Sequence, residues 1–532
     1  MLAAKGTKMD GPEGKQIESV EEMIGRFTGE LLGHTRQWEN ELIEHPDSLE
    51  AIERQIHKVF ARGADMMTAG LLAVAISGGF VEQAEQKTRK EFSRPLTKGR
   101  VRTVAVRLLG GMVLWMTTLY CPPKRKRFRQ DDQPRVGLDV TLAQFGFGNG
   151  VSPGLESRVA RKVALCPSIA FAHSELAREG VELDRKAVGR ITYQCGEAML
   201  ALRAHRIEQL YRGELASSGE LAGKRVSVQI DGGRMKIRGE MTVKAKAAQT
   251  FDDDGLPTED PAGRSRKVAK RSYAADWREP KLVTIFVHDD EGKMGKKTKA
   301  TIDGTLLGPD AIAEIVAMHL HRLGSAKAQS VCFVADGAPW IWDRVTAIIK
   351  LAKLEGVATY EILDCCHAVH HISLALAALS LSKQERRPLY LEHRTLLRNG
   401  QWRRVVEELE SLQEEGTSNA ELQTEISYLR RHGEAGRLRY VYFRSAGLPC
   451  GSGAIESSIR RVINLRLKSN AMFWKSENAE SMLQVRSQVI PDQWEAAMAS
   501  VNEFRRTVAR DGYRWEARSM SCKSEDSYDI AT

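Results

Sequence analysis

Two apolar runs that each end in Asp-Gly constrain this chain more than any other feature. The run Val226–Ile230 ends at Asp231, and the run Val331–Ala335 ends at Asp336. Runs of this length predict buried strands, and the glycine after each aspartate releases the chain from the strand. A carboxylate at the end of a buried strand is costly unless it is solvated, paired or bound to a cation. We therefore expect both aspartates to face a polar site.

A third carboxylate lies in a different setting. Glu456 follows the segment Cys450–Ile455, whose composition is typical of a loop that enters a helix. Three converging carboxylates make the all-oxygen kind of site that Mg²⁺ prefers. Two-metal phosphoryl transfer holds its cations about 3.5–4 Å apart, so we expect Asp231 to bridge them while Asp336 and Glu456 complete the ligand sets. Taken singly, each acid is more often a cap or turn residue.

Composition sets the class of protein and of partner. The chain has 532 residues and a formal net charge of +10, which suggests three or four domains and a polyanionic partner, nucleic acid first. A solvated basic surface has the same composition. The eight cysteines suggest no disulfide framework, and Met1–Lys15 has no apolar signal-peptide core. The apolar stretches 69–81 and 110–120 are shorter than a membrane span, so we expect a cytoplasmic protein.

The order of elements after residue 224 indicates an α/β fold. Alternation predicts strands and helical spacing predicts helices. In chain order, the predicted elements are strands 225–230, 235–241 and 282–288, helix 309–322, strand 331–336, helix 340–354 and strand 360–363. The first two strands are expected to form a hairpin about Asp231-Gly232-Gly233. A three-strand meander followed by αβαβ is the outline of an RNase H-like fold with a mixed sheet.

The remaining segments are expected to surround this core. In chain order, the predicted regions are a helical N-terminal region at 1–120 with a strand pair within 101–119, a basic linker at 121–149, a helical block at 150–215, the first part of the RNase H-like core at 224–367, an all-helical insertion at 368–445, the C-terminal helices of the core with Glu456 at 446–515, and a flexible tail at 516–532. The linker either clamps a phosphate backbone or is simply solvated. The insertion either contacts DNA or provides bulk or a dimer contact.

The block 150–215 has the outline of a helix-turn-helix. A short helix at 168–179 ends at Gly180, and Asp184 is placed to cap the next helix. Arg185, Lys186 and Arg190 would line that second helix and contact DNA. Any helical hairpin gives the same pattern, so packing alone is the alternative.

Four motifs carry a resemblance to a known family. They are Ile230–Arg234, Trp277–Glu279, Asp336–Trp342 and Gly451–Ser457, the last extending through Asn464, Arg466, Leu467, Lys468, Met472, Trp474, Ala479, Glu480, Leu483 and Arg486. Together they resemble the ISKra group of bacterial insertion-sequence transposases, in the DDE superfamily near the Mutator-like transposases. The resemblance covers about residues 150–490. It implies an RNase H-like core whose acidic triad is Asp231, Asp336 and Glu456.

A fifth motif extends the resemblance. Mutator-like relatives carry a Cys- or Asp-x-x-His motif after the second acid, and Asp364–His367 matches it. The resemblance implies that His367 positions a scissile phosphate or strand end, whereas a packed core histidine is the alternative. Zinc is not expected beside Cys365 and Cys366, because a second ligand pair is missing. The Cys-x-x-Cys of many members is also missing at Cys121, and the first 100 residues match no motif.

The segment after Glu456 is rich in positive charge. Arg460, Arg461, Arg466 and Lys468 are expected to neutralise a DNA backbone beside the scissile phosphate. Trp474 either stacks on an unpaired base or packs in a core between helices.

The sequence therefore predicts a metal-dependent DDE transposase, with two Mg²⁺ or Mn²⁺ ions. It would cut its element ends and join their 3′-hydroxyls to target DNA. Its partners would be double-stranded DNA and further copies of the chain, as a homodimer or larger oligomer, at the nucleoid of a bacterial cytoplasm and not at a membrane. The alternatives are an RNase H-like nuclease or resolvase that cuts without joining, and a domesticated DNA-binding regulator.

Overall fold

The computed structural model describes residues 2–4, 20–76, 79–92, 96–122, 137–148, 150–239, 274–295, 299–413, 419–469, 472–507, 518 and 520. They form two compact units. The first contains residues 1–204 and 493–514, and the second contains residues 205–492 and 515–532. Residues 123–136 and 149 of the expected basic linker and nearly all of the expected tail lie outside the described residues, whereas 137–148 form β4, α4 and the residues next to them.

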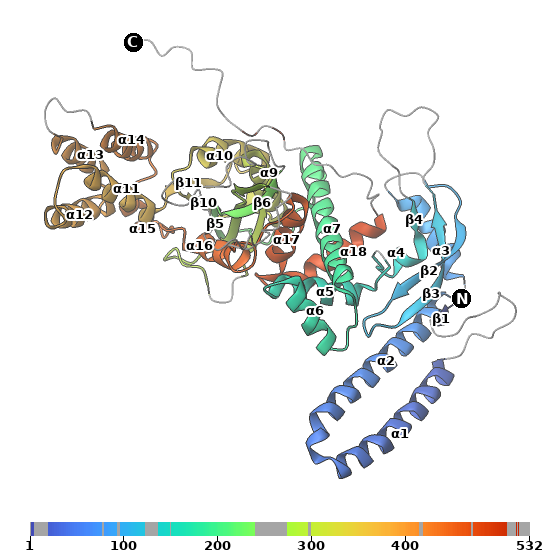
Figure 1. The fold of residues 1–532 in the computed structure, drawn as a ribbon. Coiled ribbons are helices and arrows are strands. Elements are labelled where there is room, and N and C mark those ends of the chain that lie inside the picture. Colours follow the sequence, from blue (N-terminus) through green and yellow to red (C-terminus); the bar gives the residue numbers. More distant parts are fainter. Residues whose placement is uncertain are drawn as a thin grey trace. The chain divides into compact units, whose positions relative to one another are not determined.

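The first unit combines helices with an antiparallel sheet. Its elements are β1 (Leu2–Ala4), α1 (Val20–Glu44), the 3₁₀ turn η1 (Pro46–Ser48), α2 (Leu49–Ile76), α3 (Phe80–Glu91), β2 (Arg100–Arg107), β3 (Val113–Cys121), β4 (Leu138–Asp139), α4 (Val140–Gln144), α5 (Pro153–Leu165), α6 (Ile169–Arg178), the first part of α7 (Arg185–Arg212) and α18 (Trp494–Thr507). Figure 1 shows α1 and α2 as an antiparallel hairpin. The strand pair expected within 101–119 is confirmed, since β2 pairs with β3.

One helix of the described residues is long and apolar enough to cross a membrane, and it spans Pro46–Ile76. The apolar stretch that begins at residue 69 forms the C-terminal part of this helix. The helix nevertheless carries a buried acid. The Asp65 carboxylate accepts N–H bonds from Gly110 and Met112, each at 2.9 Å. Burial raises the pKa of Asp65 more than these two bonds lower it.

A buried ion pair joins the two chain segments of the first unit. Arg505 of α18 bonds both carboxylate oxygens of Glu156 on α5, one of them at 2.6 Å, and both side chains are almost fully buried. On the same two helices, the Trp494 indole donates to Ser157 Oγ at 2.7 Å. The expected boundary of the catalytic core at 515 was therefore wrong. The C-terminal helix belongs to the first unit because its partners there are specific and buried.

The second unit is built on a five-stranded mixed sheet in the order β11-β10-β5-β8-β9. The strands are β5 (Arg225–Gly232), β8 (Lys281–Val287), β9 (Thr301–Thr305), β10 (Ser330–Ala335) and β11 (Ala358–Leu363). β10 is parallel to both β5 and β11, whereas β8 is antiparallel to β5 and to β9. The α/β class is confirmed.

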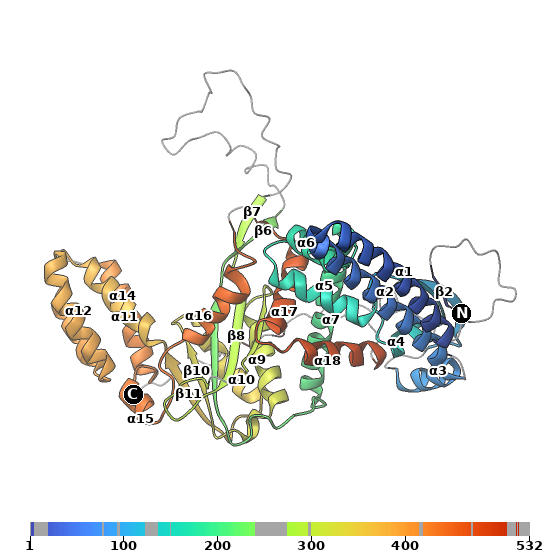
Figure 2. The same cartoon turned by 90° about the horizontal axis from the view of Figure 1, so that it is seen from below.

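The first hairpin differs from the expectation. β6 (Met235–Gly239) does not pair with β5, but pairs with β7 (Ala274–Arg278) in a separate two-stranded sheet. The partner of β5 is β8, and the third strand of the meander is β9, which the sequence pattern missed. The β6–β7 ribbon continues the β5–β8 hairpin past a break at Gly233, whose N–H bonds Pro280 O at 2.8 Å. Figure 2 shows the ribbon extending beyond the end of β8.

Side chains alternate between the two faces of the sheet, and different helices cover the two faces. On one face, Val228 and Ile285 pack with the buried side of α9 (Pro309–Leu323), which is followed by the turn η2 (Ser325–Lys327) and by α10 (Pro339–Leu351). On the other face, Thr284 bonds Ser458 of α16 (Gly453–Ile459) at 2.9 Å. Gln229 and Asp231 share that second face, because they alternate with Val228 along β5.

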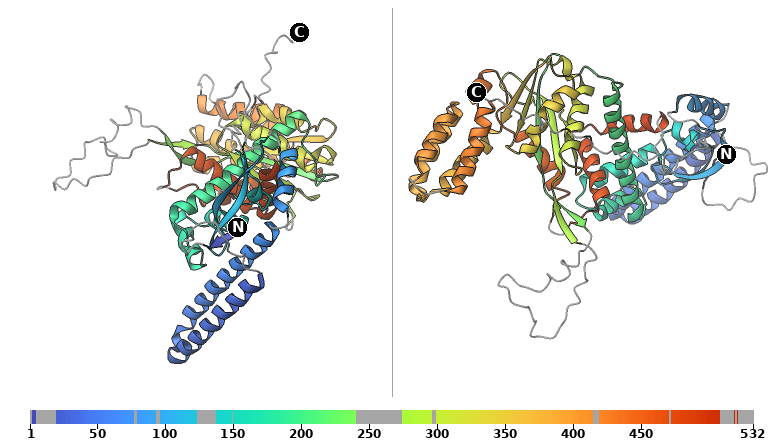
Figure 3. Two further views of the ribbon diagram at one scale, coloured as in Figure 1. Left: turned by 90° about the vertical axis from the view of Figure 1, so that its right-hand side faces the viewer. Right: turned by 90° about the horizontal axis from the view of Figure 1, so that it is seen from above.

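The predicted all-helical insertion is confirmed. Its helices are α11 (Cys365–Ala378), α12 (Lys383–Arg398), α13 (Trp402–Ser411), α14 (Ala420–Glu434) and α15 (Tyr440–Ser445). They gather beside β11, the edge strand of the sheet (Figure 1), and are orange in Figure 3. After α16, a π-helical turn (Arg460–Asn464) and α17 (Ser476–Val489) complete the unit.

The Glu156–Arg505 pair gives a stability prediction for the first unit. Glu156→Gln should destabilise this unit by about 3–5 kcal/mol, because it leaves a buried guanidinium without its counter-charge. Hydrogen–deuterium exchange during urea unfolding, read on peptides from α5 and α18, measures the loss. The control is Glu182→Gln, whose exposed pair with Lys58 at 3.2 Å should contribute less than about 1 kcal/mol. Equal losses in the two variants would contradict a structural role for the buried pair.

Candidate functional site

Three aspartates form a row at the carboxyl ends of three neighbouring parallel strands. Ile230, Ala335 and Leu363 lie side by side on β5, β10 and β11 in parallel register. The next residue on each strand is an aspartate, namely Asp231, Asp336 and Asp364. Neighbouring strands are about 4.8 Å apart, so the register alone brings these three residues together. Asp231 and Asp336 were expected here, whereas Asp364 was considered only as part of a motif.

The Asp364 carboxylate connects two elements that are distant in the chain. Its Oδ1 accepts the His367 N–H at 2.9 Å and so caps α11, and its Oδ2 accepts the N–H of Ser452. Burial alone would raise the pKa of this carboxyl, but the bonds from His367 and Ser452 outweigh it and hold the pKa well below its ordinary value. Asp364 is therefore a stable anion at the junction of β11, α11 and the loop before α16.

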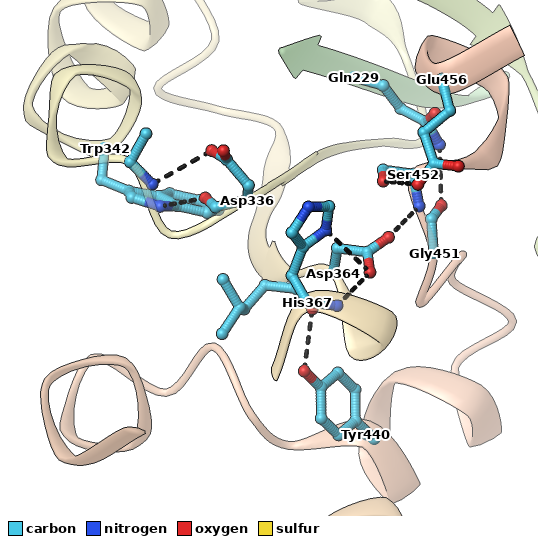
Figure 4. Close-up of polar contacts among 11 residues, drawn as sticks. Gln229, Asp336, Trp342, Asp364, His367, Tyr440, Gly451, Ser452 and Glu456 are labelled. Atoms are coloured by element: carbon cyan, nitrogen blue, oxygen red, sulfur yellow. Dashed lines mark hydrogen bonds and ion pairs between the residues drawn. The ribbon is translucent and has the colours of Figure 1, made fainter. Parts of the chain in front are cut away.

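The loop that carries Glu456 is held a second time from the sheet. The Gln229 amide donates to Gly451 O and accepts from Ile455 N, each at 3.0 Å. Gln229 is buried on β5, two residues before Asp231. Within the loop, Ser452 Oγ lies 3.4 Å from Glu456 Oε1. The first turn of α16 therefore has a fixed position relative to the row of aspartates (Figure 4).

One group of side chains in the described residues has metal-ligand geometry. The ligand atoms of Asp364, His367 and Glu456 all lie within 4.8 Å of one another. Figure 4 shows the His367 ring between Asp336 on one side and the Asp364 and Glu456 carboxylates on the other. No cysteine belongs to this group, and Cys366, the nearest candidate, is exposed.

The ionisable groups of the site have shifted pKa values. Burial raises the pKa of Asp231 to about 6, with further increases from the charges of Asp336 and Glu456. Burial also raises the pKa of Asp336. The hydrogen bond with Asp364 raises the pKa of His367, and Asp336 and Asp231 add to the effect. The neighbouring carboxylates therefore favour the protonated form of His367.

The structure brings most of the expected site together, with one addition. Asp336 and Glu456 both act on the charge of Asp231, and His367 acts on Asp231 and Asp336. The tightest group, however, contains Asp364 in place of Asp231 and Asp336. The sequence held the signal for it, because Tyr360–Leu363 was predicted as a strand that Asp364 directly follows, as in the two other runs.

A glutamate between β7 and β8 also belongs to this neighbourhood. The Glu279 side chain fills the space over Gly232, where a Cβ would collide with its Oε1. Its charge contributes to the raised pKa of Asp336, and its other oxygen pairs with Lys281 Nζ at 3.1 Å. The sequence motif Trp277–Glu279 pointed to this segment without giving it a role.

The expected DNA-binding residues divide into exposed and buried sets. For Arg466 the expected DNA contact was wrong, whereas for Trp474 the structure supports core packing, the second of its two predicted roles. Trp474 is only 7% exposed, with its indole N–H bonded to Leu467 O at 3.1 Å, and Arg466 is 4% exposed, with its guanidinium over the Trp474 ring. Both side chains pack where α17 and the π-helical turn meet β6, so neither reaches solvent. The exposed residues are Arg460, Arg461 and Lys468 in the second unit and Arg185, Lys186 and Arg190 in the first.

The helical block of the first unit agrees with its predicted outline. Ser152 and Ser168 cap α5 and α6, and Asp184 Oδ1 accepts the N–H of Ala187 at 2.9 Å at the start of α7. The second helix, α7, continues to Arg212.

The chain was compared with models of protein families, with curated proteins and with solved structures, and none of them matches it. Conclusions about function therefore rest on the residues and on the geometry of the second unit.

The pKa of Asp231 gives a prediction for the metal-free protein. A carboxyl whose folded pKa is raised contributes stability below its unfolded pKa and loses that contribution as pH rises through the folded pKa, here about 6. Asp231→Asn should therefore raise the unfolding temperature by a few °C at pH 7.5 in EDTA, and by clearly less at pH 5. Differential scanning fluorimetry of both proteins at both pH values tests this. An equal difference at the two pH values would show that Asp231 is not the group responsible.

Proposed function

We propose that this chain is a DDE transposase with an RNase H-like catalytic core. The observation that carries the proposal is the row Asp231–Asp336 at the carboxyl ends of two adjacent parallel strands, with Glu456 brought beside it by a later helix. The sheet order also supports it. Numbered along the chain, the strands lie in the order 3-2-1-4-5, and only the second is antiparallel to the others, an arrangement expected of an RNase H-like core.

The donor set fits two hard cations. Asp231, Asp336 and Glu456 offer carboxylate oxygens, and the raised pKa of Asp231 marks a buried carboxylate whose charge the protein leaves partly uncompensated. These three residues would hold two Mg²⁺ or Mn²⁺ ions. When bound, such ions polarise a phosphodiester and increase the acidity of an attacking water or 3′-hydroxyl.

The other residues of the site would position Glu456 and the bound DNA strand. Asp364 and Gln229 hold the loop before α16, so that Glu456 is presented to the row of aspartates. His367, with one ring nitrogen facing Asp364 at 3.4 Å, is oriented toward the site and would bond a phosphate oxygen through its other nitrogen. The exposed Arg460 and Arg461 follow Glu456 by four and five residues and would contact the backbone of the bound strand.

The chemistry would be hydrolysis at the element end followed by attack of the freed 3′-hydroxyl on target DNA. The partner would be double-stranded DNA, bound by a homodimer or larger oligomer. An RNase H-like nuclease or resolvase uses the same carboxylates but leaves pre-cut ends unjoined. A DNA-binding regulator derived from such an enzyme would bind without cutting.

Asp231→Asn tests the proposal. It keeps the size of the side chain and removes the charge of the expected bridging ligand, so cleavage and joining should both fall by at least about 100-fold. DNA affinity should be kept, because one negative charge near the phosphates is lost. The measurements are a gel shift and strand transfer from pre-cut ends with Mg²⁺.

The matched control is Asp290→Asn, a change at an acid whose side chain is 93% exposed. It should behave as wild type in both assays. Near-normal strand transfer by Asp231→Asn would overturn the proposal, and cleavage without joining by the wild type would favour the nuclease.

A further inference from the structure

The β6–β7 ribbon presents an exposed aromatic ring near the catalytic row. Trp277 on β7 is 53% exposed, the most exposed tryptophan in the described part of the chain. It pairs across the ribbon with Lys236, whose ammonium lies 5.0 Å from the centre of the indole ring and 5.5 Å from that of Phe473. This cation–π contact fixes the ring in place while leaving half of its surface uncovered.

The ribbon beneath this ring is firmly supported. The segment ending at Trp474 runs along the outer edge of β6, where Trp474 N–H bonds Lys236 O at 3.1 Å and Arg238 N–H bonds Trp474 O at 2.8 Å. Met235 and Ile237 are buried beneath the ribbon. The exposed indole is therefore attached to a short three-stranded patch and not to a loop.

The position of the ring relative to the row follows from strand geometry. Lys236 follows Asp231 by five residues, and a fully extended strand rises about 3.3 Å per residue, so the backbone at Lys236, and with it its partner Trp277, lies at most roughly 16 Å from the row. B-DNA rises 3.4 Å per base, so this distance corresponds to about five nucleotides.

Charge on the ribbon favours an anionic strand. Lys236 lies beside the ring, and the ribbon with its adjoining residues also carries the exposed cations Arg234, Arg238, Arg278 and Lys475, against the two acids Asp276 and Glu279. A tryptophan ring can stack only on a base that has left the duplex, and such stacking tolerates any base because each has a π face.

We infer that Trp277 is a stacking platform for an unpaired base of the DNA strand held in the catalytic site. The inference rests on the proposed function for the identity of that strand. Lys236 fixes the ring, the neighbouring arginines contact the phosphates, and the stacked base lies within about five nucleotides of the scissile bond. This gives a binding role to the motif Trp277–Glu279, which the acidic triad leaves unexplained.

The first test measures binding of single-stranded DNA by the full-length protein in EDTA. The probes are a fluorescein-labelled dT12 strand and its dT12·dA12 duplex, followed by fluorescence anisotropy. Trp277→Ala should weaken binding of the single strand about ten-fold and change binding of the duplex less than two-fold. Trp277→Phe should keep most of the affinity, and Trp115→Ala, at a 40% exposed tryptophan on β3, should behave as wild type.

A second measurement does not depend on any variant folding. A dT12 strand with 5-iodouracil at one position, irradiated with the wild-type protein, should form a crosslink to the peptide that contains Trp277. Crosslinks only to other peptides, or unchanged dT12 affinity in Trp277→Ala, would overturn the inference and leave the ribbon as a surface for a protein partner.

These outcomes are separable from the proposed function. Both measurements omit the metal and need no cleavage, so stacking at Trp277 can be observed even if Asp231→Asn retains full strand transfer. Conversely, loss of strand transfer in Asp231→Asn with no effect of Trp277→Ala would support the proposed transposase function and overturn the stacking role of Trp277.

Discussion

The Asp364 carboxylate is the contact on which the candidate site depends. One of its oxygens caps α11, and the other accepts the N–H of Ser452, so a single anion joins the end of β11 to the loop before Glu456. The backbone follows the same connection, since Cys365 N–H bonds Cys450 O at 3.0 Å. Without these bonds, the first turn of α16 would be held to the sheet chiefly through Gln229 and the Thr284–Ser458 contact.

Two aspartates of this row, Asp364 and Asp231, have pKa values shifted in opposite directions. Asp364 receives hydrogen bonds from both sides, so its pKa is low and its charge is compensated by the protein. Asp231 receives one bond, from Gly232 N–H at 2.6 Å, and its pKa is raised to about 6 by burial and by neighbouring acids. A buried anion without compensation favours a cation at that position. The difference separates the two roles: Asp364 positions Glu456, whereas Asp231 is suited to bind metal.

Much of this arrangement could be predicted from the sequence, and the limits have physical causes. Apolar runs that end in Asp-Gly identified β5 and β10, and helical spacing identified α9, α10 and the insertion. Strand pairing was less accessible, because the alternating pattern of β6 does not encode whether it pairs with β5 or with a distant β7. The burial of Arg466 was missed, and that of Trp474 could not be decided, for a related reason. Both depend on β6 lying beside Trp474, a contact between segments more than two hundred residues apart.

The helical insertion also shapes the site that it interrupts. The insertion follows β11 directly, and its C-terminal end returns to that strand, since Leu363 N–H bonds Arg437 O at 3.2 Å and Tyr440 donates to Leu363 O at 3.0 Å. Between these ends, Tyr428 of α14 stacks on His371 and packs against Gly337, directly after Asp336, where any side chain would collide with the tyrosine ring. The insertion therefore fixes the loop after Asp336 and, through Asp364, the loop before Glu456. Because both loops depend on it, the insertion is part of the site's architecture and not an appendage to a complete core.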